Sequence, residues 1–182
     1  MPILIIFPDE AHFNLDGYVN KKNCHIWGTE NPHTYIEKPS HPKRVTVWCG
    51  FWSRGIIASF FFENKQGEAV TVNGNRYRAF LNKFLFIGRK EEIGNIWFQQ
   101  DDATCHTAEA TLVALGPVFE DRIISRRADV VWPPWSCDLT PLDNYLWDAV
   151  KDKRYADEPA TIEALKHNIS EAIGEIQLHT ID

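Results

Sequence analysis

The stretch Ile96-Trp97-Phe98-Gln99-Gln100-Asp101-Asp102 decides the fold, because its short apolar run predicts a buried strand and two acids follow at once. A helix is predicted next, from about Thr107 to Leu115, and then a strand over residues 122–125. Strands that alternate with helices in this way indicate an α/β layer architecture.

Three strands are predicted before this stretch. The run Ile3 to Phe7 is short and apolar, whereas residues 45–52 are apolar on both faces, as a central strand requires. A turn at 53–55 leads into residues 56–62, which predicts a hairpin. A helix then follows, whose buried face has the spacing i, i+3, i+4, i+7 and i+8: Tyr77, Phe80, Leu81, Phe84 and Leu85.

Two helices are predicted at the end of the chain. The first has Thr140 as its N-cap and Pro141 at its first position, and its predicted buried face is Leu142, Tyr145, Leu146, Ala149 and Val150. The second starts near Thr161 and is predicted to bury Ile162, Leu165, Ile169 and Ile173. The complete order predicts an α/β fold with a mixed β-sheet flanked by helices.

Composition limits the classes of protein that the chain can belong to. Its 182 residues are predicted to form one domain, 1–182, without an internal repeat or linker. No run approaches the roughly 18 apolar residues that span a bilayer. The four cysteines are scattered, which suits a reducing compartment, the cytosol or nucleus. The net charge of −6 counts against strong autonomous DNA binding, because DNA-binding domains usually carry a basic surface.

Three acids are candidates for a metal site. Asp9 follows the first predicted strand, Asp101 follows the fourth, and Asp143 lies in the first turn of a later helix. Acids so placed are expected to meet at one end of the sheet. Carboxylates suit hard divalent ions, and two such ions about 3.5–4 Å apart catalyse in-line phosphoryl transfer.

Each acid also has an ordinary structural explanation. Asp9 can belong to a turn at a strand end, and Asp101 can cap the next helix. Asp143 can complete a capping arrangement with Thr140, three residues before it. Composition and spacing alone leave the choice between these explanations and a metal site open.

Three segments, in the same order, resemble motifs of the mariner-like transposases of the DDE/D superfamily. Residues 7–13, Phe-Pro-Asp-Glu-Ala-His-Phe, resemble F-S-D-E-x-x-F, and residues 98–106, ending in Gln-Asp-Asp-Ala-Thr-Cys-His, resemble Q-D-x-A-x-x-H. Residues 132–147 contain Ser-Cys-Asp-Leu-Thr-Pro-Leu-Asp, which is similar to S-P-D-L-x-P-x-[D/E]. The resemblance extends through residues 17–20 and 44–50 to the terminal helices, so it covers essentially the whole chain.

The resemblance implies a ribonuclease-H-like fold and a catalytic triad of Asp9, Asp101 and Asp143 that binds two Mg²⁺ or Mn²⁺ ions. The activity it implies is metal-dependent cleavage of double-stranded DNA at transposon ends, followed by strand transfer. It further implies a homodimer, a nuclear location, and neither membrane association nor an organic cofactor. The helix-turn-helix module that precedes the catalytic domain in the family is expected to be absent from this sequence.

The sequence departs from the family pattern at several positions. Asp102 stands where glycine is common, Pro8 replaces a small polar residue, and Trp135 stands where arginine is frequent. The 41 residues between Asp101 and Asp143 make a longer spacing than in the best-known mariner subgroup. Asp138 is a rival third acid, although the motif register favours Asp143.

Several residues outside the triad are candidates for DNA contacts, with solvated surface or core packing as the alternative for each. They are His106, Arg126, Arg127, Trp132, Lys151 and Lys153. His106 is also a candidate for ordering the active site. The polar segment 63–75 occupies the place of the family's clamp loop, which contacts a second subunit. A zinc site of Cys105, His106 and Cys137 matches no common spacing.

Two other classes of function compete with the transposase hypothesis. The first is an inactive or repurposed remnant that binds DNA or protein, which the departures at Asp102 and Trp135 favour. The second is a general ribonuclease-H-like nuclease that acts on RNA hybrids. Metal binding separates the first from an active enzyme, and a comparison of substrates separates the second.

Overall fold

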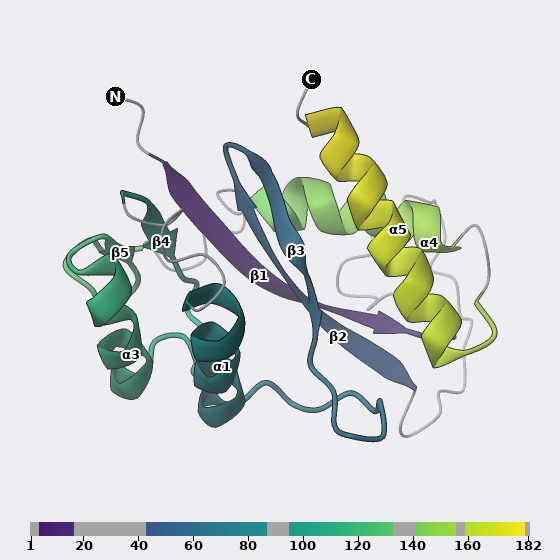
Figure 1. Ribbon diagram of the computed structural model, residues 1–182, viewed down its shortest axis with the longest axis horizontal. Helices are drawn as coiled ribbons and strands as arrows, with labels where there is room; N and C mark the ends of the chain where they lie inside the picture. The colour runs from purple at the N-terminus through teal and green to yellow at the C-terminus, as the bar shows by residue number, and fades with distance from the viewer. Residues whose placement is uncertain (1–3, 17–42, 87–94, 133–140, 156–158, 181–182) are drawn as a thin grey trace, which may run out of the picture.

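A five-stranded sheet organises the structure, a computed structural model that describes residues 4–16, 43–86, 95–132, 141–155 and 159–180. Its strands are β1 (Ile5–Asn14), β2 (Arg44–Trp52), β3 (Gly55–Phe61), β4 (Trp97–Gln99) and β5 (Ile123–Ile124). They lie in the order β3-β2-β1-β4-β5 (Figure 1). β2 runs antiparallel to both of its neighbours, β1 and β3, whereas β1, β4 and β5 are parallel. The sheet is therefore mixed, as predicted.

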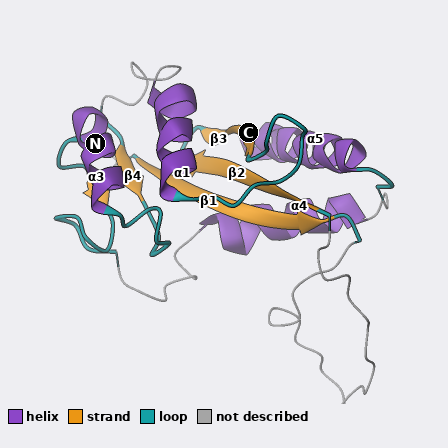
Figure 2. Ribbon diagram, turned by 90° about the horizontal axis from the view of Figure 1, so that it is seen from below, coloured by secondary structure: helices purple, strands orange, loops and turns teal. Residues whose placement is uncertain are grey.

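Two groups of helices cover the sheet. α1 (Gly74–Phe80), which continues into the π-helical segment η2 (Leu81–Phe86), lies beside α3 (Glu109–Phe119) near β4. The other group is η4 (Leu142–Leu146), its continuation α4 (Trp147–Tyr155), and α5 (Ile162–Thr180). Figure 2 shows α1 and α3 together at one end of the sheet, away from α5. No helix in the described part of the chain is long and apolar enough to cross a membrane.

Alternation along the central strands directs side chains into two separate cores. Ile6 and Trp48 pack in the core that holds α1 and α3, whereas Phe13 and Val47 pack in the core that holds α4 and α5. Since successive side chains of a strand point to opposite faces, the odd-numbered residues of β1 face α4 and the even-numbered ones face α1. Consecutive polar residues in the middle of β1 must therefore lie on opposite faces of the sheet.

Pro8 marks the place where β1 and β4 part. The parallel ladder pairs Ile5 with Trp97 and Ile6 with Phe98, and the Leu4 carbonyl accepts a hydrogen bond from the Trp97 N–H. Because backbone groups alternate in direction along a strand, those of Pro8 also face β4, but proline has no N–H to donate. The ladder ends before Pro8, while β1 continues to pair with β2 as far as Asn14.

The first strand is longer than the sequence analysis predicted. The prediction ended it at Phe7, so that Asp9 would follow the strand, whereas Asp9 lies inside β1. The prediction was wrong because it relied on an unbroken apolar run. Beyond Pro8 the strand buries only alternate residues, Ala11 and Phe13, opposite Val47 and Val45 of β2.

The helix predicted from Thr140 to Val150 has a different geometry. Pro141 is its N-cap, Thr140 lies outside the described residues, and the first turn is the π-helix η4. The Trp147 N–H donates to the Leu142 carbonyl, five residues earlier, which brings Trp147 to the buried side. Tyr145, predicted to be buried, is 52% exposed.

The remaining elements follow the predictions closely. The hairpin forms from β2 and β3, and Tyr77, Phe80 and Leu81 are buried as the helical spacing predicted. The side chains of Phe84 and Leu85 lie outside the described part. α3 begins at Glu109 and runs to Phe119, beyond the predicted end at Leu115, and includes Pro117. α5 buries three of its four predicted residues, and Ile162 is half-buried.

The ring of Phe119 holds α3 on the sheet, which provides a test of the fold. It stacks on Phe98 of β4 with ring centroids 4.8 Å apart and is fully buried. Phe119→Ala should lower the free energy of unfolding by about 3–5 kcal/mol, because it leaves a cavity between α3 and β4. Val113→Ala on the same helix is the matched control, since Val113 is 69% exposed, and it should cost less than about 0.5 kcal/mol. Urea denaturation measures both, and equal effects would contradict this packing.

Candidate active site

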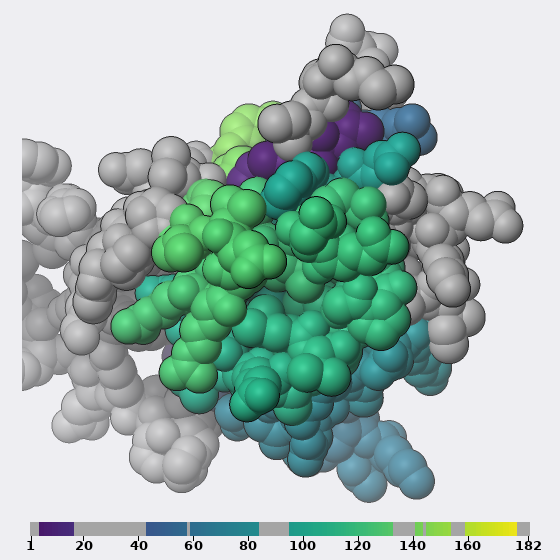
Figure 3. Space-filling view, turned by 90° about the vertical axis from the view of Figure 1, so that its left-hand side faces the viewer, coloured from purple at the N-terminus to yellow at the C-terminus, as the bar shows by residue number. Residues whose placement is uncertain are grey.

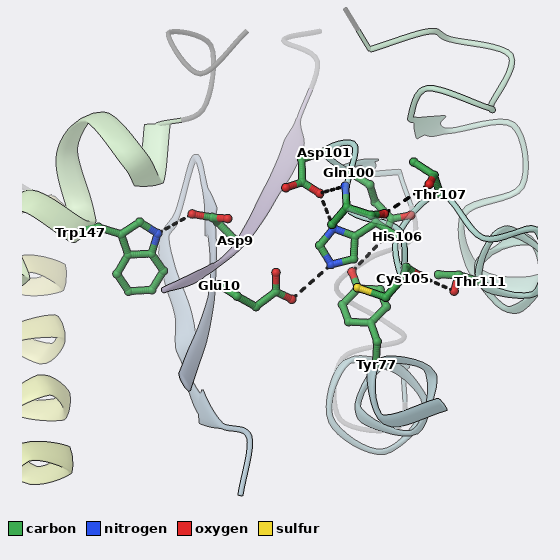
Figure 4. A network of polar contacts seen from close by, with 11 residues as sticks. Asp9, Glu10, Tyr77, Gln100, Asp101, Cys105, His106, Thr107, Thr111 and Trp147 are labelled. Atoms are coloured by element: carbon green, nitrogen blue, oxygen red, sulfur yellow. Dashed lines mark hydrogen bonds and ion pairs between the residues drawn. The ribbon is translucent and has the colours of Figure 1, made fainter. Parts of the chain in front are cut away.

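Asp9 is held on the α4 face of the sheet by an indole. Its Oδ2 accepts a hydrogen bond of 2.6 Å from Nε1 of Trp147 (Figure 4). The π-helical turn of η4 places Trp147 there, because its five-residue step turns the indole toward β1. One oxygen of Asp9 is therefore fixed by a residue 138 positions later in the chain.

Asp143 comes to Asp9 from the first turn of the same helix. The two carboxyl groups lie close enough to interact by a hydrogen bond, which one of them can donate only when it is protonated. Burial raises the pKa of Asp9 well above its usual range, and the charge of Asp143 raises it further, although the Trp147 hydrogen bond opposes the shift. Burial also raises the pKa of Asp143, against the lowering effects of the bond to Asp9 and of Lys151. Burial and the repulsion between the two carboxyl groups therefore outweigh the opposing charge of Lys151.

Asp101 lies just beyond the end of β4, at the level of Asp9 if the register of the ladder is continued. Its Oδ1 accepts a 3.0 Å hydrogen bond from the Ala103 N–H and a second hydrogen bond from Nδ1 of His106. Burial alone would raise the pKa of Asp101, but the bond and charge of His106, with the bond from Ala103, lower it. Asp101 is thus an ionised carboxylate, and its side chain is 45% exposed.

His106 connects Asp101 to β1. Its ring is buried, and its Nε2 lies 3.3 Å from Oε1 of Glu10 (Figure 4). The ring of Tyr77 lies against it, with centroids 4.4 Å apart, and the Tyr77 hydroxyl accepts a 2.8 Å hydrogen bond from Gln100. Burial would lower the pKa of His106, but the acidic groups around the ring, Tyr77, Glu10 and Asp101, raise it well above its usual value. This position favours the predicted ordering role over a contact with DNA.

Asp102 lies close to Arg126, on the loop after β5. Its Oδ2 lies 3.8 Å from a guanidinium nitrogen of Arg126. Its Oδ1 is buried and has no hydrogen-bond partner. The extra charge at this position, where the family commonly has glycine, is therefore partly balanced by Arg126.

The donor chemistry of this region fits a divalent cation. The raised pKa values of Asp9 and Asp143 show that a positive charge between these two carboxyl groups would be favourable, and Asp101 is close enough for its charge to raise the pKa of Asp143. Among the described residues, no three His, Cys, Asp or Glu side chains converge closely enough to hold one ion. The structure brings Asp9 and Asp143 together and leaves Asp101 on the His106 side.

The predicted DNA-contacting cations lie on two sides of the acids. Arg126 and Arg127 are exposed on the loop after β5, which lies on the face shown in Figure 3, and Trp132 at the end of that loop is half-buried. Lys151 lies 3.6 Å from Asp148 and acts electrostatically on Asp143. Lys153 forms an ion pair with Glu175 on α5 and lies farther along α4.

Two other predictions concern segments near this region. Segment 63–75 is partly ordered by a bridge between Glu63 and Ala69, and Lys166 of α5 pairs with Glu63. Its role as a clamp loop stays a prediction. The alternative zinc site needs Cys137, which lies outside the described residues, as do Asp138 and Trp135.

Sequence reasoning missed the residues that hold the acids in place: Glu10, Tyr77, Gln100 and Trp147. Glu10 had a usable signal, because it lies next to Asp9 and period-2 alternation sends it to the opposite face of the sheet. Trp147 had none. It reaches Asp9 only through a π turn, which the spacing of apolar residues does not reveal.

The mixed five-stranded sheet with helices on its faces and acids along β1 and after β4 defines a ribonuclease-H-like domain. The crystal structure of the catalytic domain of Mos1 mariner transposase superimposes with a TM-score of 0.60 at 18% identity, covering 97% of this chain and 78% of that one. The Mos1 mariner paired end complex with Mn gives a TM-score of 0.61 at 17% identity, with 97% and 53% covered.

Comparison of sequences finds a similar curated protein. Transposable element Tc3 transposase of Caenorhabditis elegans is 27% identical over 174 residues, which cover 92% of this chain and 48% of that protein. The chain thus spans about half the length of this curated relative. No protein-family model matches the sequence. Sequence and fold together confirm the similarity to the catalytic domain of mariner-like transposases.

The repulsion between the carboxyl groups of Asp9 and Asp143 leads to a prediction about stability. Because its pKa is raised, Asp9 holds its proton more tightly in the folded protein than in the unfolded chain. The free energy of unfolding of the metal-free protein therefore falls as the pH rises from the unfolded pKa through the raised folded pKa. Asp9→Asn removes this loss and should raise the melting temperature at pH 7 by roughly 2–4 °C for each kcal/mol recovered.

Calorimetry in a chelating buffer measures this effect. Asp129→Asn is the control, because Asp129 is exposed and its substitution should leave the melting temperature unchanged. A melting temperature of Asp9→Asn at or below that of the wild type at pH 7 would show that the carboxyl pair is not strained.

Proposed function

We propose that the chain is a transposase catalytic domain that cleaves DNA at transposon ends and transfers the strands in a divalent-metal-dependent reaction. The observation that carries the proposal is the pairing of Asp9 with Asp143 beside Asp101. Two carboxyl groups from distant parts of the sequence meet, and the third is close enough for its charge to raise the pKa of Asp143.

The relatives support this activity. The names of the matching Mos1 structures describe a paired-end complex with the left transposon end and paired-end complexes with Mn and with Mg. Those descriptions belong to Mos1, and for this chain double-stranded DNA and Mg²⁺ or Mn²⁺ remain proposals, as do the number of ions, a homodimer and a nuclear location.

Each acid has a distinct task in the proposed reaction. Asp9, Asp101 and Asp143 would hold two ions, which when bound activate the attacking oxygen and stabilise the leaving one. Trp147 fixes one oxygen of Asp9, and the Ala103 N–H fixes one oxygen of Asp101. The attacking group is water in cleavage and a DNA 3′ hydroxyl in strand transfer, and the carboxylates orient either one in line with the phosphate.

The basic residues would bind the phosphates that flank the scissile bond. Arg126 and Arg127 extend from one side of the acids, Lys151 lies on the other near Asp143, and Lys153 continues along α4. Trp132 is half-buried at the end of the arginine loop, where its ring can pack against a nucleotide. With a net charge of −6, these few cations would position DNA rather than capture it.

A catalytically inactive remnant is the second candidate function. The observation that favours it is the lack, among described residues, of a three-residue group close enough to hold one ion. The partial neutralisation of Asp102 by Arg126 favours the enzyme instead, because it limits the repulsion that an added acid brings to the site.

Nicking of supercoiled plasmid in Mn²⁺ tests the proposed activity. Asp101→Asn should reduce the nicking rate by more than about 100-fold. Loss of a residue that only supports a metal ligand typically costs about 10–100-fold, and Asp101 is proposed as a ligand itself. Asp129→Asn, on the exposed loop after β5, should nick at the wild-type rate. Activity that survives Asp101→Asn would sink the assignment, and a wild type that binds no Mn²⁺ in a calorimetric titration would favour the remnant.

The identity of the third acid is tested in the same assay. Asp143→Asn should abolish Mn²⁺-dependent nicking, because it removes the carboxylate that pairs with Asp9. Asp138→Asn should retain at least about half of the activity if Asp138 is not a ligand. The reverse result would assign the third ligand to Asp138.

A further inference from the structure

Glu10 is a largely buried acid to which the proposed chemistry assigns no role. It follows Asp9 in β1, yet its side chain lies on the opposite face of the sheet, and only 14% of it is exposed. Its Oε1 lies 3.3 Å from Nε2 of His106. Burying a carboxylate is costly unless it is paired, so its position needs an explanation.

His106 is bonded to carboxylates at both ring nitrogens. Nδ1 bonds to Oδ1 of Asp101 and Nε2 faces Glu10, while Tyr77 covers the ring (Figure 4). A local ion pair five residues apart would need only Asp101. The second carboxylate comes from 96 positions away and ties the loop after β4 back to β1.

This tie lies where the backbone ladder is missing. β1 and β4 are joined by hydrogen bonds only as far as Ile6 and Phe98, and Pro8 cannot extend the ladder. Beyond that point the side-chain contacts from Glu10 to His106 and from His106 to Asp101 link the two segments. It therefore sets the separation between Asp9 and Asp101.

The contact with His106 also distinguishes the two carboxylate oxygens of Asp101. Oδ1 accepts from both the Ala103 N–H and His106, whereas no described residue donates to Oδ2. In Figure 4 the second oxygen points away from the His106 ring, toward the side on which Asp9 lies. Oδ2 is thus the oxygen that is available to a ligand.

We propose that Glu10 is a positioning residue, which acts through His106 to hold Asp101 so that Oδ2 alone is presented to the metal ion. This inference rests on the proposed function, because it assigns a role within the same site. His106 itself is a positioning residue and touches no substrate.

Two substitutions of Glu10 test the inference. Glu10→Met keeps the length of the side chain and removes the acceptor for Nε2, so the dissociation constant for Mn²⁺ should rise by about 10–100-fold. Glu10→Gln keeps an acceptor oxygen and should restore binding to within about threefold of the wild type. Glu171→Met, at an exposed position of α5, is the matched control and should bind as the wild type does. The free Mn²⁺ signal in electron paramagnetic resonance measures all four proteins.

The nuclear magnetic resonance signals of the His106 ring give a second readout that needs neither metal nor activity. The Nε2 proton should be protected from exchange in the wild type and in Glu10→Gln but not in Glu10→Met. Wild-type affinity or protection in Glu10→Met would overturn the inference, as would an equal loss of affinity in Glu10→Gln. A wild type that binds Mn²⁺ with these effects but does not nick DNA would overturn the proposed function alone.

Discussion

The end of the hydrogen-bond ladder between β1 and β4 is the constraint on which the site depends. Beyond Ile6 and Phe98 the backbone pairing of β1 with β4 no longer fixes how Asp101 lies relative to Asp9. Pro8 stops the ladder without unfolding β1, because β2 continues to pair along its other edge. The strand therefore stays rigid while it presents Asp9 to one face and Glu10 to the other.

The fold was predictable from the sequence because its elements have strong local signals. The apolar hairpin strands, the helical spacing around Tyr77 and the order of elements predicted a mixed sheet with helices. The ends of elements were less predictable: Asp9 lies within β1 because pairing with β2 outweighs the polar residues of the strand. The motifs selected the three acids and His106, which lies five positions from Asp101. The local signals did not reveal the other supports, because Trp147 reaches Asp9 across 138 positions and Glu10 reaches His106 across 96.

The surrounding residues lower the pKa of Asp101, whereas the pKa values of Asp9 and Asp143 are raised. Asp101 receives two hydrogen bonds, one of them from the buried imidazole of His106, so its negative charge is stabilised without metal. Asp9 also receives hydrogen bonds, from Trp147 and from the Glu10 backbone, but burial and the charge of Asp143 outweigh them and raise its pKa. Asp101 is therefore stabilised by protein donors, whereas Asp9 and Asp143 would gain most from the proposed cation.

This division also links stability to function. A site whose carboxylates were all satisfied by protein donors would fold more stably but would bind a cation weakly, because the cation would have to replace existing bonds. A site with three unsupported carboxylates would repel itself and lose its geometry. The structure lies between these limits. Trp147 fixes one oxygen of Asp9 and His106 fixes one oxygen of Asp101, while the other oxygens of these two carboxylates could still bind the proposed cation. The rigidity comes from the two cores on either side of β1, so the acids can be strained without disturbing the sheet that carries them.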